Sequence, residues 1–428
     1  MMIAGVVGNL LVLGYFKYID FFISIIEARA PQPAAVPLAL SFTTFVQIAF
    51  LVHIWQKRSS VEFPQYAMFV SFFPHLIAGP IVRWSDLGSQ IADPVRYKVD
   101  FQNVAVGLTM FAFGLAKKVL IADGLSPWVS PVFDAAVRGE PITAFAAWGA
   151  AFAYSAQLYF DFSGYCDMAV GLGLLFNLRL PINFAAPLRS TSVIDFWRRW
   201  HISLSNFLRD FVYVPLGGSK CGAFRQSLNL IAAFVLGGLW HGANWTFIAW
   251  GAFNGVLLII NHAWRALRGT RKPTFITRFA GWSATFGAFA IGMAMFRSAN
   301  VHAMQHMLLA MAGLENGPES IKHVAVDVDR WLIFKGYVSK SFVHSLAGQN
   351  WSAVATVSTV LALGIALVVP DTMELLNYRE GEPHVRWRRY SQDATWRPSV
   401  AWLVLVCVLM GVSFSYLWRV NEFLYYQF

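Results

Sequence analysis

Long apolar runs recur along the whole chain of 428 residues, and they constrain its fold more than any other feature. Mostly apolar stretches long enough to cross a bilayer lie near 36–55, 104–121, 143–160, 228–241 with 245–263, 279–296, 351–370 and 399–418. Shorter or broken stretches lie at 2–26, 66–82, 165–178 and 303–313. Because an open sheet cannot satisfy its edges in lipid, we expect an all-α polytopic membrane protein with roughly eight to ten membrane segments, some of them broken or re-entrant.

The composition excludes an ordinary soluble domain. Hydrophobic residues make up 57% of the chain and charged residues 13%, against about 25% charged in soluble domains. The net charge of +10 would suggest a nucleic-acid partner in a soluble protein. Here we attribute it to cytoplasmic loops that face anionic lipids, so we expect contact with membrane lipids and no nucleic acid.

The chain reads as one unit. Short polar links join most of the apolar runs and no internal repeat is evident, so residues 1–428 are expected to form a single membrane domain. Two polar insertions, 314–350 and 371–398, are expected to lie outside the membrane. Three cysteines show neither CxxC nor metal-ligand spacing, so we expect no disulfide framework and no metal site.

Residues 194–211 are too polar to span a bilayer, but they show helical periodicity. An apolar stripe runs along one side of the expected helix and consists of Phe196, Trp200, Leu204, Phe207 and Phe211. This pattern predicts an amphipathic helix that lies in the membrane interface or over a cavity. His201 lies beside the edge of the stripe, so we expect its ring to face the protein or the membrane surface.

His241 lies in a glycine-rich segment between two apolar runs. Ionisable groups at membrane depth are costly and by default functional, and an imidazole can exchange a proton near neutral pH. The alternative is a structural histidine satisfied by a backbone carbonyl, and the residues leave both interpretations open. Gly237, Gly238 and Gly242 would allow either close helix packing or room for a substrate tunnel.

Three further polar residues interrupt apolar sequence. His75 lies at a helix break made by two prolines and a glycine, where we favour a capping or packing role over catalysis. Asp161 and Asp167 lie among aromatic residues, and either could hold a histidine in one tautomer or pair with an arginine. For Asp167, a helix N-cap is an equal alternative. No Walker loop, nucleophile elbow or His-Glu-x-x-His motif occurs, so these residues indicate a membrane enzyme or transporter without choosing between them.

Four longer motifs carry a specific resemblance. In chain order they read FPHLIAGPIVR, QLYFDFSGYCDMAVGLG, DFWRRWHISLSNFLRDFVYVPLGG and GGLWHGANWTFIAWGAFNG. The chain closely resembles the membrane-bound O-acyltransferase (MBOAT) superfamily, and best its bacterial alginate O-acetyltransferase branch. The likeness extends from LGYFKY at 13–18 to the last residues, and it is strongest over 155–255.

The resemblance implies an O-acetyltransferase with an MBOAT-like helical core in the bacterial inner membrane. Members of this branch take acetyl from a cytoplasmic donor, here expected to be acetyl-CoA, and pass it toward an exported polysaccharide such as alginate. A periplasmic acetyltransferase of the SGNH-hydrolase-like type and the polysaccharide export machinery are the expected partners. No bound cofactor is expected.

The resemblance also assigns roles to the two histidines. The family's essential histidine corresponds to His241 and its second histidine to His201. We expect His241 to act as general base toward the acceptor hydroxyl. The oxyanion formed on the thioester would be stabilised by Asn244, backbone N–H groups or His201.

A set of supporting residues completes the expected site. Three arginines near His201 would attract the phosphates of coenzyme A, although contact with lipid headgroups is an alternative that we slightly favour: Arg198, Arg199 and Arg209. Asp161 and His75 are expected in supporting positions.

The chain departs from the family pattern at its start. Family members usually begin with further hydrophobic helices before the position of LGYFKY, whereas here that motif begins at residue 13. We expect either a misassigned start codon or a shorter variant that lacks these N-terminal helices.

Other functions remain open. The acceptor could instead be teichoic acid, peptidoglycan or a protein, although the motifs FDFSGY and WHGANW favour the alginate-like branch. A transporter with a proton relay through His241 and Asp161, or a scaffold of a secretion complex, would need no acyl transfer. Donor turnover that depends on His241 separates the enzyme from both.

Overall fold

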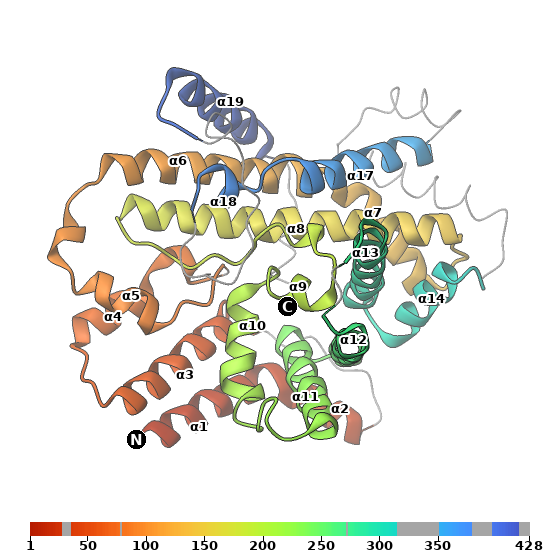
Figure 1. The fold of residues 1–428 in the computed structure, drawn as a ribbon, viewed down its shortest axis with the longest axis horizontal. Helices are drawn as coiled ribbons and strands as arrows, with labels where there is room; N and C mark the ends of the chain where they lie inside the picture. The colour runs from red at the N-terminus through yellow and green to blue at the C-terminus, as the bar shows by residue number, and fades with distance from the viewer. Residues whose placement is uncertain (28–35, 78, 271–272, 315–350, 379–395, 419–428) are drawn as a thin grey trace.

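The structure is a computed structural model that describes residues 1–27, 36–77, 79–270, 273–314, 351–378 and 396–418 (Figure 1). Within these ranges the regular structure is helical throughout, which confirms the all-α prediction. The longer helices are α1 (Met2–Leu13), α2 (Ile19–Ile26), α3 (Leu40–Lys57), α6 (Phe101–Ala116), α7 (Asp123–Arg138), α8 (Ala144–Leu175), α11 (Ala223–His241), α12 (Trp245–Arg268), α13 (Phe275–Arg297), α14 (Val301–Met311), α17 (Trp351–Val368) and α19 (Val400–Tyr416). The shorter elements are η1 (Gly14–Tyr18), α4 (Phe63–Ser71), η2 (Phe73–His75), α5 (Trp84–Ile91), η3 (Pro94–Tyr97), η4 (Lys117–Ala122), η5 (Pro187–Arg189), α9 (Val193–Trp197), α10 (Ile202–Leu208), η6 (Arg209–Tyr213) and α18 (Thr372–Leu375).

Two long helices, α6 and α8, lie side by side at the centre, and α17 runs along α8 (Figure 1). Glycines bring the backbones of α6 and α8 close together. A Cβ atom on Gly114 would lie 2.5 Å from the carbonyl oxygen of Gly164, and a Cβ on Gly164 would lie 2.6 Å from that of Gly114. Side chains at these positions would therefore push apart the two helices, against which α7, α13, α17 and α19 pack.

Five helical segments are long and apolar enough to cross a membrane: Met2–Ile26, Phe101–Arg138, Trp245–Arg268, Phe275–Arg297 and Val354–Leu375. The shorter apolar helix α19 adds a sixth apolar segment to the described part of the chain. Helices α3, α8 and α11 intersperse polar residues among apolar ones, and the eight to ten membrane segments that we expected stay a prediction. The arrangement is that of a multi-pass membrane protein.

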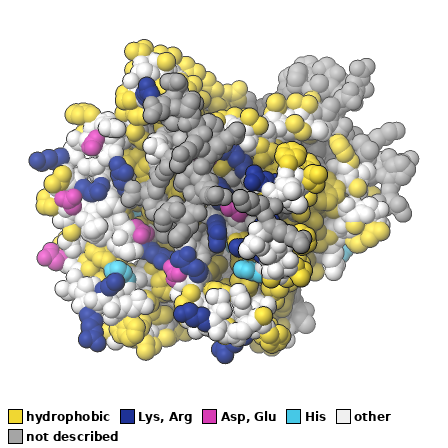
Figure 2. Space-filling view, in the orientation of Figure 1, with side chains coloured by type: hydrophobic (Ala, Val, Ile, Leu, Met, Phe, Trp, Pro, Cys, Tyr) yellow, Lys and Arg dark blue, Asp and Glu magenta, His cyan; other side chains and the backbone are white. Residues whose placement is uncertain are grey.

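The exposed surface is apolar where a membrane protein meets lipid. Hydrophobic side chains spread over α19 in the space-filling view (Figure 2), where Val400, Leu403 and Val404 are well exposed. Leu10 and Leu11 on α1 and Phe275 and Ile276 on α13 are exposed in the same way. In water such a surface would be unfavourable, and in a bilayer it needs no partner.

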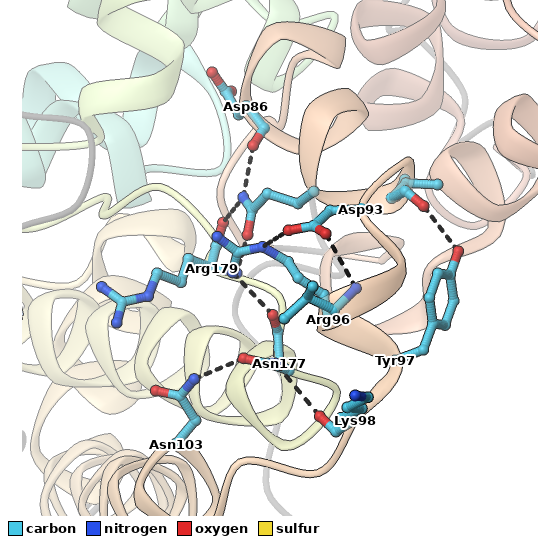
Figure 3. A network of polar contacts seen from close by, with 11 residues as sticks. Asp86, Asp93, Arg96, Tyr97, Lys98, Asn103, Asn177 and Arg179 are labelled. Carbon is cyan, nitrogen blue, oxygen red and sulfur yellow. Dashed lines mark hydrogen bonds and ion pairs between the residues drawn. The ribbon is translucent and has the colours of Figure 1, made fainter.

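A polar network fixes the segment between the first helices and the central pair (Figure 3). Gln90 and Arg179 exchange two hydrogen bonds of 2.9 Å, one from the Gln90 amide to the Arg179 carbonyl and one from the Arg179 N–H to the Gln90 amide oxygen. Arg96 donates to the Asn177 carbonyl over 3.1 Å, and Asn103 donates to the Asn177 side chain over 2.7 Å. These contacts hold α5 and η3 against the end of α8 and the start of α6.

The expected amphipathic helix over 194–211 is broken in the structure. Helix α9 ends at Trp197 and α10 begins at Ile202, because His201 adopts a left-handed conformation with φ of 43°. The stripe itself is buried as expected, with Phe196, Trp200 and Leu204 each at most 5% exposed. The prediction of one continuous helix was wrong, because periodicity reports which side is buried and not whether the backbone continues.

The second expected insertion, 371–398, begins inside the core. Asp371, Met373 and Tyr378 are buried, and α18 lies beside the central helices. Residues 379–395 of this insertion, and nearly all of 314–350, lie outside the described residues. The buried part follows from charge pairing, since Asp371 reaches the ammonium group of Lys117 at 3.3 Å.

Candidate active site

His241 is the last residue of α11, and its ring is surrounded by aromatic side chains. It is 6% exposed, and its ring centroid lies 5.0 Å from that of Phe296, 5.4 Å from that of Trp250 and 4.9 Å from that of Trp240. An imidazole in such apolar surroundings favours its neutral form, which is the form that can accept a proton.

His201 lies next to His241 although 40 positions separate them in the sequence. The two ring centroids are 6.5 Å apart, and His201 is 2% exposed. Burial lowers the pKa of His201 to about 3, so this imidazole is neutral at physiological pH. Its left-handed backbone is a conformation that non-glycine residues rarely adopt and that clusters at functional sites.

Asn183 fixes the position of His201, although no sequence motif points to it. Its side-chain oxygen lies 3.4 Å from Nδ1 of His201 and accepts hydrogen bonds from the Ser203 N–H (3.0 Å) and hydroxyl (2.8 Å). Its amide nitrogen donates to the Gly79 carbonyl over 3.2 Å, and the Ile81 N–H donates to the Ser203 hydroxyl over 2.9 Å. The motifs at 73–83 and 195–218 therefore meet around His201.

A cavity of about 660 Å³ lies between α9, α10, η6, α11 and α12. Buried His241 contributes to its wall, and three arginines also line it, with the ring of His262 beside them: Arg198, Arg209 and Arg265. The cavity therefore joins a positively charged region, suited to phosphate groups, to a histidine in apolar surroundings.

A second, much smaller chamber of about 20 Å³ is bordered by both His201 and His241. Its other lining residues are apolar or aromatic: Leu158, Phe162, Trp197, Trp200, Leu204, Trp250, Met293 and Phe296. Trp197, Leu204, His241 and Trp250 line both spaces. A group that enters this chamber from the larger cavity is therefore in reach of both imidazoles.

The three expected arginines separate into two kinds. Arg198 and Arg209 line the cavity, and Arg209 also pairs with Asp210 at 2.7 Å. Arg199 instead pairs with Asp195 at 3.0 Å and donates to the Ala185 carbonyl over 3.1 Å. Arg199 is not among the cavity's lining residues, so its contacts hold the loop before His201.

Asp161 and Asp167 pair with lysines of η4 rather than with a histidine. Lys118 lies 2.5 Å from Asp161 and 2.8 Å from Asp123. Lys117 lies 2.7 Å from Asp167. These buried pairs tie η4 to α8, and neither carboxylate is among the residues that line the two spaces.

Asn244 and His75 also lie outside the lining of both spaces. Asn244 caps α12, since its side-chain oxygen accepts from the Thr246 N–H (3.1 Å) and its amide donates to the Ala299 carbonyl (2.8 Å). His75 ends η2 and is buried against Phe69 and Phe72.

The glycines beside His241 serve close packing and the cavity at once. A Cβ on Gly238 would lie 2.1 Å from the carbonyl oxygen of Phe247, and one on Gly242 would lie 2.3 Å from its ring. Gly237, in contrast, lines the large cavity. Among the residues that the structure describes, no cluster of His, Cys, Asp or Glu is suited to hold a metal ion.

Comparison with known proteins decides the family. The profile of the MBOAT, membrane-bound O-acyltransferase family matches residues 39–306, which is more than half of the chain and includes both histidines. The chain belongs to the MBOAT family. The resemblance inferred from the four motifs is thereby confirmed.

Three relatives indicate the range of acceptors within the family. This MBOAT chain is 38% identical to the peptidoglycan O-acetyltransferase of Helicobacter pylori over 77% of its own length and 68% of that protein. It is 44% identical to the "Probable alginate O-acetylase" of Azotobacter vinelandii over 72% of its length and 62% of that protein. It is 31% identical to the teichoic acid D-alanyltransferase of Streptococcus thermophilus over 53% of its length and 57% of that protein. The alignments thus span between about half and two thirds of these relatives.

The N-terminal segment of this MBOAT chain reaches the end of α11. The Lys17 ammonium group donates to the carbonyls of Trp240 (2.5 Å) and His241 (3.3 Å), and the Tyr18 hydroxyl donates to that of Leu239 (2.7 Å). Both residues belong to the LGYFKY motif, whose part in the site could not be inferred from sequence.

Proposed function

We propose that this MBOAT chain transfers acetyl from acetyl-CoA toward a hydroxyl group of an exported cell-envelope polysaccharide at the bacterial inner membrane. The observation that carries the proposal is the position of His241 and His201 on one small chamber, next to a cavity with basic side chains. The nearby relatives act, by their names, on peptidoglycan and alginate, and both of these acceptors carry hydroxyl groups.

In the proposed reaction, His241 is the general base. Its neutral imidazole takes the proton of the acceptor hydroxyl while the oxygen attacks the thioester carbon. The carbon–sulfur bond then breaks, and the imidazolium returns the proton to the departing thiolate, which releases coenzyme A as thiol and restores the neutral base. The apolar and aromatic lining of the chamber disfavours bulk water beside the base. Asn244 receives no oxyanion role in this scheme, since both ends of its amide are engaged at the cap of α12.

His201 is proposed to orient the acceptor. With Nδ1 facing the Asn183 side-chain oxygen, the N–H is assigned to Nδ1, which leaves Nε2 as the acceptor nitrogen. A neutral imidazole in this tautomer accepts a hydrogen bond from a second hydroxyl of the acceptor. Its closeness to His241 would then align the reacting hydroxyl.

The donor is proposed to bind in the large cavity. Arg198 and Arg209 would contact the phosphates of coenzyme A, with Arg265 beside them. The chamber of about 20 Å³ suits the methyl end of an acetyl group and is too small for a long acyl chain. Headgroup contact by the same arginines is compatible with this arrangement once the donor has left.

The acceptor and the partners are proposed from the hydroxyl chemistry of the reaction and from the names of the relatives. We favour an alginate-like polymer, with peptidoglycan or teichoic acid as the second candidate because relatives of both names are similar to this chain. A periplasmic SGNH-like acetyltransferase and the polysaccharide export machinery would complete the transfer. A proton relay of a transporter through His241 and Asp161 is disfavoured, because the Asp161 carboxylate pairs with Lys118.

The test compares polymer-bound acetyl in cells that carry wild type, His241→Ala or the matched control His302→Ala, whose ring is exposed. Membrane levels of the three proteins are equalised. Loss of a general base predicts a fall of at least about 100-fold for His241→Ala and none for the control. Unchanged acetylation in His241→Ala would refute the proposal and return His241 to a structural role.

A further inference from the structure

The end of α11 is held by side chains from a distant part of the chain. Its last three carbonyls, those of Leu239, Trp240 and His241, each accept a hydrogen bond from Lys17 or Tyr18 of η1. The carbonyls at a helix C-terminus have no partner within the helix, and they carry the negative end of the helix dipole. The buried Lys17 ammonium group and the Tyr18 hydroxyl supply the missing hydrogen-bond donors, and the ammonium group also places a positive charge at the negative end of the dipole.

Lys17 is buried at this helix end, and within the described residues it forms no ion pair with a carboxylate. It is 8% exposed, and its remaining polar contact is the Ser41 hydroxyl of α3 at 3.1 Å. Within the described residues every acceptor of its ammonium group is a neutral oxygen. An ammonium group is expensive to bury without a carboxylate, so its retention at this point indicates a specific role.

The helix end that Lys17 holds is also the end that carries His241. The helix stops there because Gly242 is extended, with φ of −172°. The ammonium group lies 6.0 Å from the centroid of the Trp240 ring, which in turn contacts His241 and His201. Release of these carbonyls would allow the last turn to unwind and the His241 ring to leave the chamber.

We propose that Lys17 and Tyr18 form a latch that positions His241 for proton abstraction. The proposal rests on the proposed function, and it makes Lys17 a positioning residue that acts through His241. Lys17 lines neither the cavity nor the chamber, so the latch does not bind the donor. Loss of the latch therefore lowers kcat and leaves the KM for acetyl-CoA unchanged.

The test uses the purified full chain in lipid nanodiscs with acetyl-CoA as the donor, in four forms: wild type, Lys17→Met, Lys17→Arg and the matched control Lys57→Met. Lys57 is an exposed lysine at the end of α3. For Lys17→Met we expect kcat for acetyl-CoA turnover to fall about tenfold or more, since small displacements of a catalytic group have effects of this size. Lys17→Arg retains a donor and a charge, and should restore kcat to within about threefold of wild type.

A second readout does not depend on activity. Hydrogen–deuterium exchange of the peptide 236–244 should become faster in Lys17→Met, while exchange in α6 and α8 stays unchanged. Tyr18→Phe removes one hydroxyl at little risk to folding, and it should produce a smaller change of the same kind. Unchanged exchange at 236–244, faster exchange everywhere, or a rise in KM at constant kcat would each overturn the latch.

The two proposals fail in different ways. A wild-type protein that does not turn over acetyl-CoA refutes the proposed donor, whereas the exchange comparison still decides whether Lys17 holds the end of α11.

Discussion

The buried pair of Asp161 and Lys118 gives a prediction that separates a structural role from a catalytic one. The Lys118 ammonium group lies between two carboxylates, 2.5 Å from Asp161 and 2.8 Å from Asp123. The side chain of Asp161 is 1% exposed, that of Asp123 10% and that of Lys118 15%. Water therefore has little access to the Asp161 carboxylate if its partner is lost.

The two partners are not equivalent. Lys118→Met removes the cation that serves both buried carboxylates, and removal of one partner from a buried pair lowers the free energy of unfolding by about 3–5 kcal/mol. Asp161→Asn leaves Lys118 paired with Asp123 and removes a repulsion between the two carboxylates. We expect it to lower the free energy of unfolding by about 1 kcal/mol, the size of one hydrogen bond.

The assay is SDS-titrated unfolding in mixed micelles, run beside acetyl transfer by the same preparations. We expect Asp161→Asn to keep near wild-type transfer per folded molecule, because Asp161 pairs with a lysine and not with a histidine. Destabilisation by Asp161→Asn as large as that by Lys118→Met would refute the inequivalence of the two partners. The structural role of Asp161 is refuted if Asp161→Asn loses transfer about 100-fold while its stability is normal, since Asp161 would then orient a catalytic group.

Further predictions concern the cavity, the chamber and the helix crossing. Arg198→Gln should raise the KM for acetyl-CoA about tenfold, in line with a lost charged hydrogen bond. Arg199→Gln should instead lower thermal stability and leave that KM unchanged. Equal effects of the two variants on KM would contradict this division of the arginines. Met293→Ala enlarges the chamber, so the ratio of kcat/KM for butyryl-CoA to that for acetyl-CoA should rise about tenfold, and an unchanged ratio would show that the chamber does not hold the acyl group. Gly238→Ala should lower the free energy of unfolding by about 3 kcal/mol because its Cβ would overlap the Phe247 carbonyl, while Gly287→Ala on α13, where a Cβ meets open space, serves as the control.

Much of the fold and part of the site could be predicted without coordinates. The apolar runs indicate an all-α membrane protein, since lipid leaves the backbone no partner outside a helix. His241 and His201 could each be identified locally, one by its apolar surroundings and the other by its place beside the stripe of 194–211. The buried face of that stripe was also predictable, because burial follows periodicity.

Other residues gave no local signal of their role. Asn183 is an ordinary polar residue in a connecting segment, and its importance comes from three neighbours at Gly79, His201 and Ser203. Asp161 has a carboxylate that suits a histidine or a cation equally well, and only the packing of η4 against α8 selects Lys118.

Composition, periodicity and side-chain chemistry are local properties, so they suffice to predict the lipid environment, the helical secondary structure and the residues capable of proton transfer. Which of those residues meet depends on how distant segments pack. His201 and His241 border one chamber because the left-handed backbone of His201 interrupts the helix between α9 and α10, and Lys17 binds the end of α11. Contacts of this kind result from many weak packing interactions between distant segments, so they cannot be predicted from any single stretch of sequence.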